Sequence, residues 1–333
     1  MIELALAFQD KDGQYAEHAG VVLASIFHNT KSAVNVHILH DETLSEDNRQ
    51  KLFELATAFN QTIQFYPVAI PEDLRQVMEN VASVNVWTTA CMYRLLIPGL
   101  VPVDKIIYLD CDILVNMDIE ELWKIELNGA YLGAVWDQNI MNVTHTISSM
   151  GLNPDLYFNS GVILFDLNSI RQKPDWYGET LNFFRNFPGT TMPDQDALNA
   201  VYGGNYLPLD LRFNLFSMAA ADPDYHNKIV HFAGEDKCWD RHSPGWELYL
   251  KYLSLTPWSK QAPHYFVTPA AAREIKGQTR IRRRKRKATG VKLRSKRSRI
   301  PRIALPHSKS VKSAGRRKAT LRKKRRGTRR RPL

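Results

Sequence analysis

Short apolar runs alternate with helical patterns over the N-terminal part of the chain, and this alternation is the feature that most constrains the fold. Apolar and β-branched runs predict strands, and apolar residues that recur on one face predict helices. We expect strands at residues 2–8, 34–39, 62–66 and 105–109, and helices at 15–28, 46–59 and 88–96. Strands separated by helices favour a mostly parallel central sheet flanked by helices on both faces. The sequence therefore predicts an α/β fold.

The second half of the chain is less regular. We expect strands at 160–167 and 229–232, and helices at 174–187, 194–202 and 245–253. After Trp258 and Pro263 the apolar pattern fades, so the globular part of the protein is predicted to end near this point.

Acidic residues stand directly after three of the expected strands. They are Asp10 and Asp12, Asp110 and Asp112, and Asp137. In open α/β sheets, ligands bind beyond the carboxyl ends of the strands. Asp110 and Asp112 are two residues apart, so both carboxylates can face one hard cation such as Mg²⁺ or Mn²⁺ if the chain turns there. Two solvated acids on a surface turn are the alternative, and the position at the sheet edge makes the two interpretations about equal.

A second motif, at residues 231–239, supplies groups that the acidic pair lacks. His231 can add a nitrogen ligand to a metal shell, and Gly234 can let the backbone approach a phosphate. Lys237 can stabilise a departing diphosphate by its charge. A histidine at the end of a strand, taken alone, is more often a core or surface residue than a ligand.

Six motifs then follow one another in a characteristic order. They are DGQYA (12–16), MYRL (92–95), YLDCD (108–112), YFNSGV (157–162), DQDALN (194–199) and HFAGEDK (231–237). In this order the sequence resembles glycosyltransferase family 8, the retaining enzymes of GT-A architecture that include bacterial lipopolysaccharide galactosyl- and glucosyltransferases and the glycogenins. The resemblance covers roughly Ile2 to Trp258. It implies a GT-A type nucleotide-sugar transferase fold.

The resemblance also implies roles for single residues, beginning with the metal and the diphosphate. Asp110, Asp112 and His231 match the family's metal ligands, which hold Mn²⁺ (or Mg²⁺) against the donor diphosphate. Gly234 and Lys237 match the loop that binds the diphosphate itself.

Other matches imply contacts with the remainder of a UDP-sugar donor. Asp12 and Tyr15 match positions that contact the uracil ring, the tyrosine by stacking. Arg94, Asn159 and Asp194 match positions that hydrogen-bond the donor sugar or orient its neighbours.

The position of Gln195 matches the side chain that the family places beneath the anomeric carbon of the sugar. Family membership implies retention of configuration, which requires either a covalent intermediate or attack on the same face of the sugar. An amide is a poor nucleophile, so we favour same-face attack, with the leaving phosphate accepting the acceptor's proton. Asp137 is a weaker candidate, for contact with the acceptor. The expected catalytic residues are Gln195, Asp194, Lys237 and Arg94.

The implied activity is that of a metal-dependent, retaining glycosyltransferase of a bacterial cell. It moves a hexose, with glucose and galactose as the first candidates, from a UDP-sugar to a glycan, lipid-linked or cell-envelope acceptor. Two departures from the family pattern stand out. Gln14 replaces the usual asparagine after a lengthened entry loop, which leaves the uridine contacts open, and Cys238 replaces the usual proline before Trp239. A nucleotidyltransferase on a similar sheet would not explain the motifs at 159–161 and 194–196.

Charge divides the chain sharply. Of its 45 Lys and Arg residues, 28 lie at or after Arg273, where Glu274 is the only one of the 34 acidic residues. The first 272 residues therefore carry 17 basic and 33 acidic residues. Such a basic segment has too few apolar residues to offset the entropy of ordering. We expect a GT-A glycosyltransferase domain at 1–258, a linker at 259–272 and a disordered basic tail at 273–333.

The tail suits three partners. An anionic membrane surface or polymer ranks first, since each cationic residue near such a membrane contributes about 1 kcal/mol of attraction. Nucleic acid ranks second, through phosphate contacts without sequence preference. The acidic part of the same chain is the third. Without interleaved aromatic residues or a recognisable reading module, specific nucleic-acid recognition is not expected. The alternative function is a nucleic-acid- or anionic-polymer-binding protein that acts through this tail.

Cysteine usage and the N-terminal stretch bear on location. Cys91, Cys111 and Cys238 are odd in number and lack C-x-x-C spacing, which argues against a disulfide framework or structural zinc and favours a reducing compartment. The first residues lack the basic region of a signal peptide, and no apolar run reaches the length of a membrane span. We expect a cytoplasmic protein, peripheral at the inner face of the membrane, with its oligomeric state left open.

Overall fold

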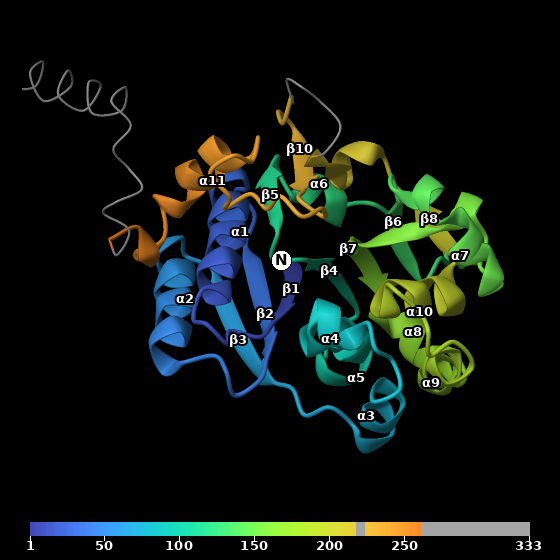
Figure 1. Ribbon diagram of the computed structural model, residues 1–333. Coiled ribbons are helices and arrows are strands. Elements are labelled where there is room, and N and C mark those ends of the chain that lie inside the picture. The colour runs from blue at the N-terminus through green and yellow to red at the C-terminus, as the bar shows by residue number, and fades with distance from the viewer. Residues whose placement is uncertain (218–223, 261–333) are drawn as a thin grey trace, which may run out of the picture. The chain divides into compact units, whose positions relative to one another are not determined.

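The computed structural model describes residues 1–217 and 224–260, shown as coloured ribbon in Figure 1. These residues belong to one compact unit, Met1–Val267. The basic tail at 273–333 and nearly all of the linker at 259–272 lie outside the described residues. Among the helices that are described, none is both long and apolar enough to cross a membrane.

A seven-stranded sheet forms the centre of this unit, with the strand order β3-β2-β1-β4-β7-β6-β8. Every pairing in it is parallel except the two that β7 makes, with β4 and with β6. The prediction of a mostly parallel sheet is therefore confirmed. The strands are β1 (Ile2–Phe8), β2 (Val34–His40), β3 (Thr62–Pro67), β4 (Lys105–Leu109), β6 (Leu132–Trp136), β7 (Phe158–Asp166) and β8 (Tyr206–Pro208).

The reversed direction of β7 matters for the site. Leu109, the last residue of β4, pairs with Val162, so the first residues of β7 lie at the edge where β4 ends. The same strand pairs Trp136, the last residue of β6, with Phe158. Asn159 and Ser160 are thereby brought beside the acidic residues that follow β4 and β6.

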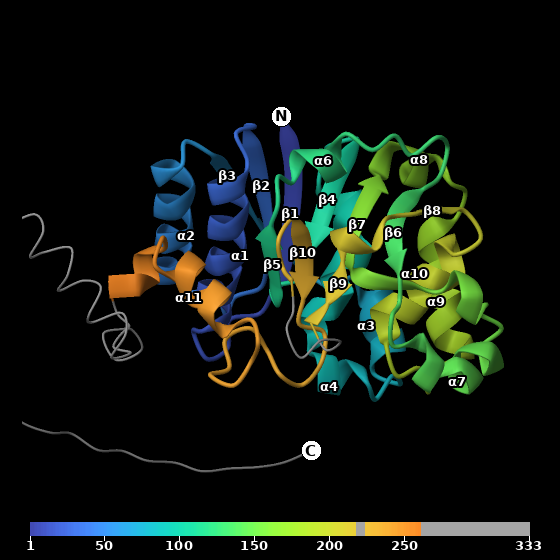
Figure 2. The ribbon, with the colours of Figure 1, turned by 90° about the horizontal axis from the view of Figure 1, so that it is seen from above.

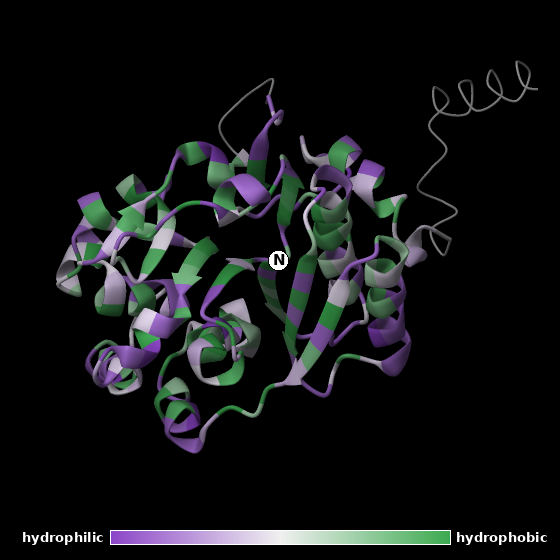
Figure 3. Cartoon of the chain, turned by 180° about the vertical axis from the view of Figure 1, so that it is seen from behind, coloured by the Kyte–Doolittle hydropathy of each residue, from purple (hydrophilic) through white to green (hydrophobic). Residues whose placement is uncertain are grey.

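Helices cover both faces of the sheet, as expected (Figure 1). Because successive residues of a strand point to opposite faces, the core is divided into two buried clusters. The first cluster packs α1 (Tyr15–Asn29), α2 (Glu46–Ala58) and α11 (Trp246–Leu253). The second packs η1 (Thr89–Leu96), α5 (Ile97–Leu100), α8 (Leu167–Gln172), α9 (Trp176–Asn186) and α10 (Pro193–Tyr202). Figure 3 shows hydrophobic residues dominating the central strands.

A second, three-stranded sheet lies above the first, on the side of α1 (Figures 1 and 2). Its order is β5-β10-β9, with β5 (Ile113–Asn116), β9 (Leu215–Phe216) and β10 (Lys228–His231). The antiparallel pairing of β10 with β5 sets His231 opposite Ile113, directly after the acidic pair. We expected a strand at 229–232 but not this partner.

Short elements complete the described part of the chain. They are α3 (Glu72–Met78), α4 (Val84–Trp87), α6 (Glu120–Trp123), η2 (Ile140–Asn142), α7 (Thr144–Ser149), η3 (Pro154–Leu156), η4 (Leu211–Phe213) and η6 (Pro257–Lys260). The expected helix at 88–96 is instead a 3₁₀ helix, preceded by Thr88 with φ of +73°. This left-handed residue separates α4 from η1, so one continuous helix cannot form there.

Candidate active site

The acidic pair lies at the junction of the two sheets. The backbone N–H of Asp110 donates to the Gly161 carbonyl at 2.9 Å, and the Phe232 N–H donates to the Asp112 carbonyl at 2.9 Å. The Tyr108 hydroxyl also donates to Asp110 Oδ1 at 2.7 Å. The chain therefore turns between β4 and β5, as a shared cation site requires, and both carboxylates remain partly exposed.

Asp110, Asp112 and His231 form the cluster that the motifs predicted. One ligand atom from each residue can be chosen so that all three lie within 4.8 Å of one another. The Nε2 atom of His231 is 3.3 Å from Asp112 Oδ1. Two carboxylates and an imidazole nitrogen suit Mn²⁺ or Mg²⁺ bound with substrate oxygens, so these donor groups fit a divalent cation.

Gly161 makes room for the histidine of this cluster. A Cβ added at position 161 would lie 2.2 Å from His231 Cε1, a distance that no real contact tolerates. Within the motif at 157–162, glycine is thus required by a ring that comes from the other sheet.

Arg94 supports the cluster from η1 and is itself buried. Its Nη2 lies 2.7 Å from Asp110 Oδ1, and its Nε lies 3.1 Å from Asp194 Oδ2. Burial opposes the charged guanidinium, but these two carboxylates outweigh it and raise the pKa of Arg94 well above its ordinary value. Arg94 therefore acts as the permanent counter-ion of two acids that would otherwise repel each other.

Lys237 approaches the cluster from the loop after β10. Its Nζ lies 2.7 Å from Asp112 Oδ2 and donates to the Phe232 carbonyl at 3.0 Å. Although burial opposes ionisation, His231 and then Lys237 hold the pKa of Asp112 well below its usual range. Asp112 is therefore ionised at neutral pH. Gly234 lies in the same loop, between His231 and Lys237.

The side chain of Gln195, near the start of α10, is buried and hydrogen-bonded to Asn159 and Asp137. Its Oε1 accepts from the Ser160 N–H at 2.9 Å and from Asn159 Nδ2 at 3.0 Å. Its Nε2 donates to Asp137 Oδ2 at 2.9 Å. Asp137, which we expected on the acceptor side, thus orients Gln195, while Asp194 accepts from the Ser160 hydroxyl at 3.1 Å.

The expected uracil contacts lie apart from this hydrogen-bonded group. Asp12 is exposed and accepts from the Gln14 N–H at 3.1 Å. Tyr15, at the start of α1, is 39% exposed and meets the Trp239 ring edge-on at 6.2 Å. Burial, together with neighbouring groups that include Asp112 and Asp110, raises the pKa of Tyr15 to about 12. The tyrosine therefore lies within electrostatic range of the acidic pair.

Sequence reasoning missed several residues that complete the site. Asn214 is hydrogen-bonded to His231 and Asn159. Ser160 is hydrogen-bonded to Arg94, Gln195 and Asp194. Ser160 stood inside a recognised motif and at the start of the expected strand at 160–167, but no role in the site was predicted for it, and β7 begins two residues earlier, at Phe158. Asn214 follows the short η4, where no apolar period or spacing marks it.

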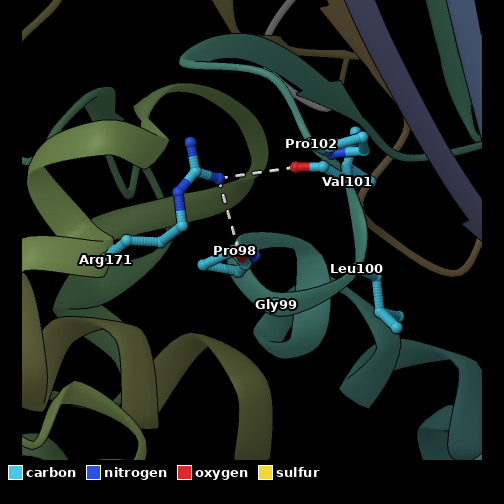
Figure 4. A pocket seen from close by; sticks show the side chains of 6 residues that line it. All are labelled: Pro98, Gly99, Leu100, Val101, Pro102 and Arg171. Atoms are coloured by element: carbon cyan, nitrogen blue, oxygen red, sulfur yellow. Dashed lines mark hydrogen bonds between the residues drawn. The ribbon is translucent and has the colours of Figure 1, made fainter.

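A separate hollow lies at the opposite end of β4. Its lining, in Figure 4, is Pro98, Gly99, Leu100, Val101, Pro102 and Arg171. The Arg171 guanidinium donates to the carbonyls of Pro98, Val101 and Val103. The cation there holds α5 against α8, and the hollow contains none of the expected site residues.

Known structures share this architecture. The galactosyltransferase LgtC, solved in complex with donor and acceptor sugar analogues, superposes with a TM-score of 0.65 at 23% identity, over 78% of this chain and 99% of that chain. The two-sheet arrangement is therefore a GT-A type fold.

Comparison at the level of sequence identifies the family. The family model of glycosyl transferase family 8 matches residues 7–243. General stress protein A of Bacillus subtilis strain 168 is 30% identical over 279 residues, which cover 74% of this chain and 92% of that protein. The lipopolysaccharide 1,2-glucosyltransferase of Escherichia coli K12 is 25% identical over 76% of this chain and 78% of that protein. The chain belongs to glycosyltransferase family 8, as its motif order predicted.

Proposed function

We propose that the protein is a metal-dependent, retaining hexosyltransferase that moves glucose or galactose from a UDP-sugar to a glycan, lipid-linked or cell-envelope acceptor. The observation that carries this proposal is the cluster of Asp110, Asp112 and His231, whose ligand atoms lie within 4.8 Å, with Lys237 at its rim. A hexose donor is supported by relatives named as lipopolysaccharide 1,2-glucosyltransferase in Escherichia coli and 1,3-galactosyltransferase in Salmonella typhimurium.

The residues of the cluster divide the work of binding. Asp110, Asp112 and His231 would hold a divalent cation, which would supply positive charge for the donor diphosphate. Lys237 adds a second cation from the loop after β10, and its side chain is partly exposed. Arg94 is fixed by Asp110 and Asp194, so it preorganises the acids and does not follow the leaving group.

Gln195 favours attack on the same face of the sugar. Its Oε1 already accepts two hydrogen bonds, from the Ser160 N–H and from Asn159 Nδ2, which occupy its lone pairs. An amide oxygen held in this way is a weak nucleophile. We infer that Gln195 and Asn159 orient the donor sugar while the leaving phosphate accepts the acceptor's proton.

The Gln195→Ala variant tests this mechanism. Under same-face attack we expect a measurable residual rate, and a loss smaller than about tenfold, roughly 1.4 kcal/mol, excludes a nucleophilic role. Intact-mass measurement after incubation with the donor is the complementary readout. A covalent sugar adduct on the wild-type protein that is absent from the variant contradicts same-face attack.

Two exposed tryptophans favour the end of β6 and α4 as the acceptor side. Trp136, which is 37% exposed, directly precedes Asp137, and its indole N–H donates to the Pro154 carbonyl at 3.1 Å. Trp87, which is 49% exposed, donates in the same way to the Thr191 carbonyl at 2.7 Å. Each ring is held through its edge and leaves apolar surface free to contact a sugar.

The decisive experiment is a thermal-shift titration with UDP-glucose, UDP-galactose and UDP-N-acetylglucosamine, each with Mn²⁺ or with EDTA. A ligand at 100 times its Kd stabilises the native state by about 2.7 kcal/mol. We expect a metal-dependent shift with one of the hexose donors. The double variant Asp110→Asn/Asp112→Asn keeps the shape of the site and should lose the shift. If no UDP-sugar shifts the wild-type protein, the proposal is wrong.

The basic tail complements this activity. We propose that its 28 Lys and Arg residues hold the enzyme at an anionic surface, with the inner face of the cytoplasmic membrane as the first candidate. This location would bring the donor site to lipid-linked or envelope acceptors. Binding to nucleic acid is the competing outcome.

A further inference from the structure

A chain of buried side chains connects the metal cluster to Gln195. His231 Nδ1 lies 3.0 Å from Asn214 Oδ1, and Asn214 Nδ2 donates to Asn159 Oδ1 at 2.8 Å. Asn159 Nδ2 then donates to Gln195 Oε1 at 3.0 Å and to Asp137 Oδ2 at 3.1 Å. Asn214 is fully buried at the centre of this chain.

The direction of these hydrogen bonds is determined at the Asp137 end. Oδ2 of Asp137 accepts from both Asn159 Nδ2 and Gln195 Nε2, so the amide nitrogens of both side chains face Asp137. The Asn159 oxygen is then turned away, where it accepts from the Gly161 N–H at 2.9 Å as well as from Asn214. Neither amide can flip without placing two acceptors against each other.

The same reasoning reaches His231. Since Asn214 Nδ2 donates to Asn159, its Oδ1 must be the atom that faces His231, and only an N–H on Nδ1 can satisfy it. Nε2, which lies 3.3 Å from Asp112 Oδ1, is then the ring nitrogen left to bind a cation placed between the two residues. The tautomer with the proton on Nδ1 is therefore the one in which Nε2 can bind a metal beside the Asp112 carboxylate.

We propose that Asn214 is a positioning residue that holds His231 in its metal-binding tautomer and, through Asn159, links that tautomer to the orientation of Gln195. The inference rests on the metal site of the proposed function. Its consequence is that one buried amide serves both halves of the site, the cation and the donor sugar.

The side chain of Asn214 can be changed without removing its backbone role. The Asn214 carbonyl accepts from Gln138 Nε2 at 2.8 Å, and Gln138 Oε1 accepts from the Phe216 N–H at 3.0 Å. These contacts hold the chain that enters β9 and remain available in any side-chain variant. Two variants therefore separate the two hydrogen bonds of the amide.

The test measures binding of Mn²⁺ alone by calorimetry. Asn214→Leu removes both hydrogen bonds and should weaken Mn²⁺ binding by about 10- to 100-fold, the usual effect of losing a partner of a ligating histidine. Asn214→Asp keeps an acceptor for Nδ1–H, so its Mn²⁺ affinity should stay within about threefold of wild type. Its carboxylate opposes the Asn159 oxygen, so kcat for transfer should fall by about tenfold or more while the dependence on Mn²⁺ concentration is kept.

Two further measurements separate positioning from general damage. Imidazole ¹⁵N spectra should show the Nδ1–H tautomer of His231 in the wild type and in Asn214→Asp, and a mixture of tautomers in Asn214→Leu. Asn35→Leu is the matched control, because Asn35 is also buried and bonds Glu3 on another part of the sheet. It should lower stability and leave Mn²⁺ affinity unchanged.

The outcomes distinguish the inference from the proposed function. Wild-type affinity for Mn²⁺ in folded Asn214→Leu overturns the inference and leaves the metal site intact. If Asn214→Leu does not fold, Asn214→Asp decides, and a loss of Mn²⁺ affinity of about tenfold or more in it overturns the inference. If the wild-type protein shows no Mn²⁺ binding that Asp112→Asn abolishes, the metal part of the proposed function fails first.

Discussion

At the scale of single residues, each carboxylate of the acidic pair is matched by a cation. Asp110 meets Arg94 at 2.7 Å, and Asp112 meets Lys237 at 2.7 Å. One of these cations is buried and fixed, and the other is on a loop and partly exposed. Arg94 is therefore a fixed counter-ion of Asp110, while Lys237 is the cation that we propose for the donor diphosphate.

Gly161→Ala tests how tightly the histidine is packed. The new Cβ would lie 2.2 Å from His231 Cε1, so the ring has to shift. We expect Mn²⁺ binding to weaken by about tenfold or more and the free energy of unfolding to fall by about 1–3 kcal/mol. Calorimetry and urea denaturation measure the two effects. Gly99→Ala is the control, since nothing lies within 4 Å of its added Cβ. Unchanged Mn²⁺ binding in Gly161→Ala contradicts this placement of the ring.

His18 links stability to pH. It stacks on Trp239 at 3.7 Å, and burial lowers its pKa from 6.5 to about 4. Below pH 6.5 the unfolded state therefore binds a proton that the folded state rejects, so stability is complete above this pH and falls as the pH drops toward 4. Between pH 7 and pH 5 we expect His18 to account for a loss of about 2 kcal/mol.

Urea denaturation at both pH values checks this expectation. In His18→Gln the difference between the two pH values should shrink by about that amount. If the change in the free energy of unfolding between the two pH values is the same in His18→Gln as in the wild type, His18 is protonated in the folded state at pH 5 and its burial does not cause the pH dependence.

At the scale of elements, two strand pairings assemble the site. The antiparallel β7 brings Asn159 and Ser160 to the edge where β4 and β6 end, and β10 pairs with β5 to bring His231 to Asp112. Packing between distant elements also fixes η6, at the end of the described chain. Trp258 of η6 is buried against α1 and donates to Asn48 Oδ1 at 3.2 Å.

Trp258→Ala should therefore destabilise the whole unit. A Cβ at Gly20 of α1 would lie 2.6 Å from the Trp258 ring, which shows how closely the ring packs on this helix. Removing a buried tryptophan costs about 3–5 kcal/mol. Thermal and urea denaturation measure the loss. Phe53→Ala, on the exposed side of α2, should stay within about 0.5 kcal/mol of wild type. Equal effects of the two substitutions contradict a core role for Trp258.

At the scale of the whole molecule, an acidic enzyme unit is joined to a strongly basic segment. We predict that the compact unit binds the donor and that the basic tail binds an anionic surface. Ending the chain after residue 267, the boundary of the compact unit, tests this prediction. The shortened protein should keep its melting temperature and its Mn²⁺-dependent UDP-sugar shift. It should no longer sediment with vesicles that contain phosphatidylserine, a binding that salt weakens in the full chain. Retention of vesicle binding assigns that property to the enzyme unit, and loss of the UDP-sugar shift shows that the tail takes part in the site.

Local patterns in the sequence predicted much of the fold, and the motifs predicted that Asp110, Asp112 and His231 lie together. The strand at Lys105–Leu109 and the acids that follow it were predicted because an apolar run ends abruptly at polar residues. Ser45, directly before the expected helix at 46–59, caps α2 with a side chain that accepts from the Asn48 N–H, as a serine at this position commonly does. The motif order identified the family, which the match over residues 7–243 confirms.

Only the tertiary structure decided which distant segments meet. The reversal of β7, the pairing of β5 with β10 and the place of Asn214 depend on hydrogen bonds between residues far apart in the chain. A local apolar pattern predicts that a segment is a strand, but it does not predict which strand pairs with it or whether the pairing is parallel or antiparallel. Gly161 illustrates the difference, since its lack of a side chain is explained only by His231, a ring 70 residues further along the sequence.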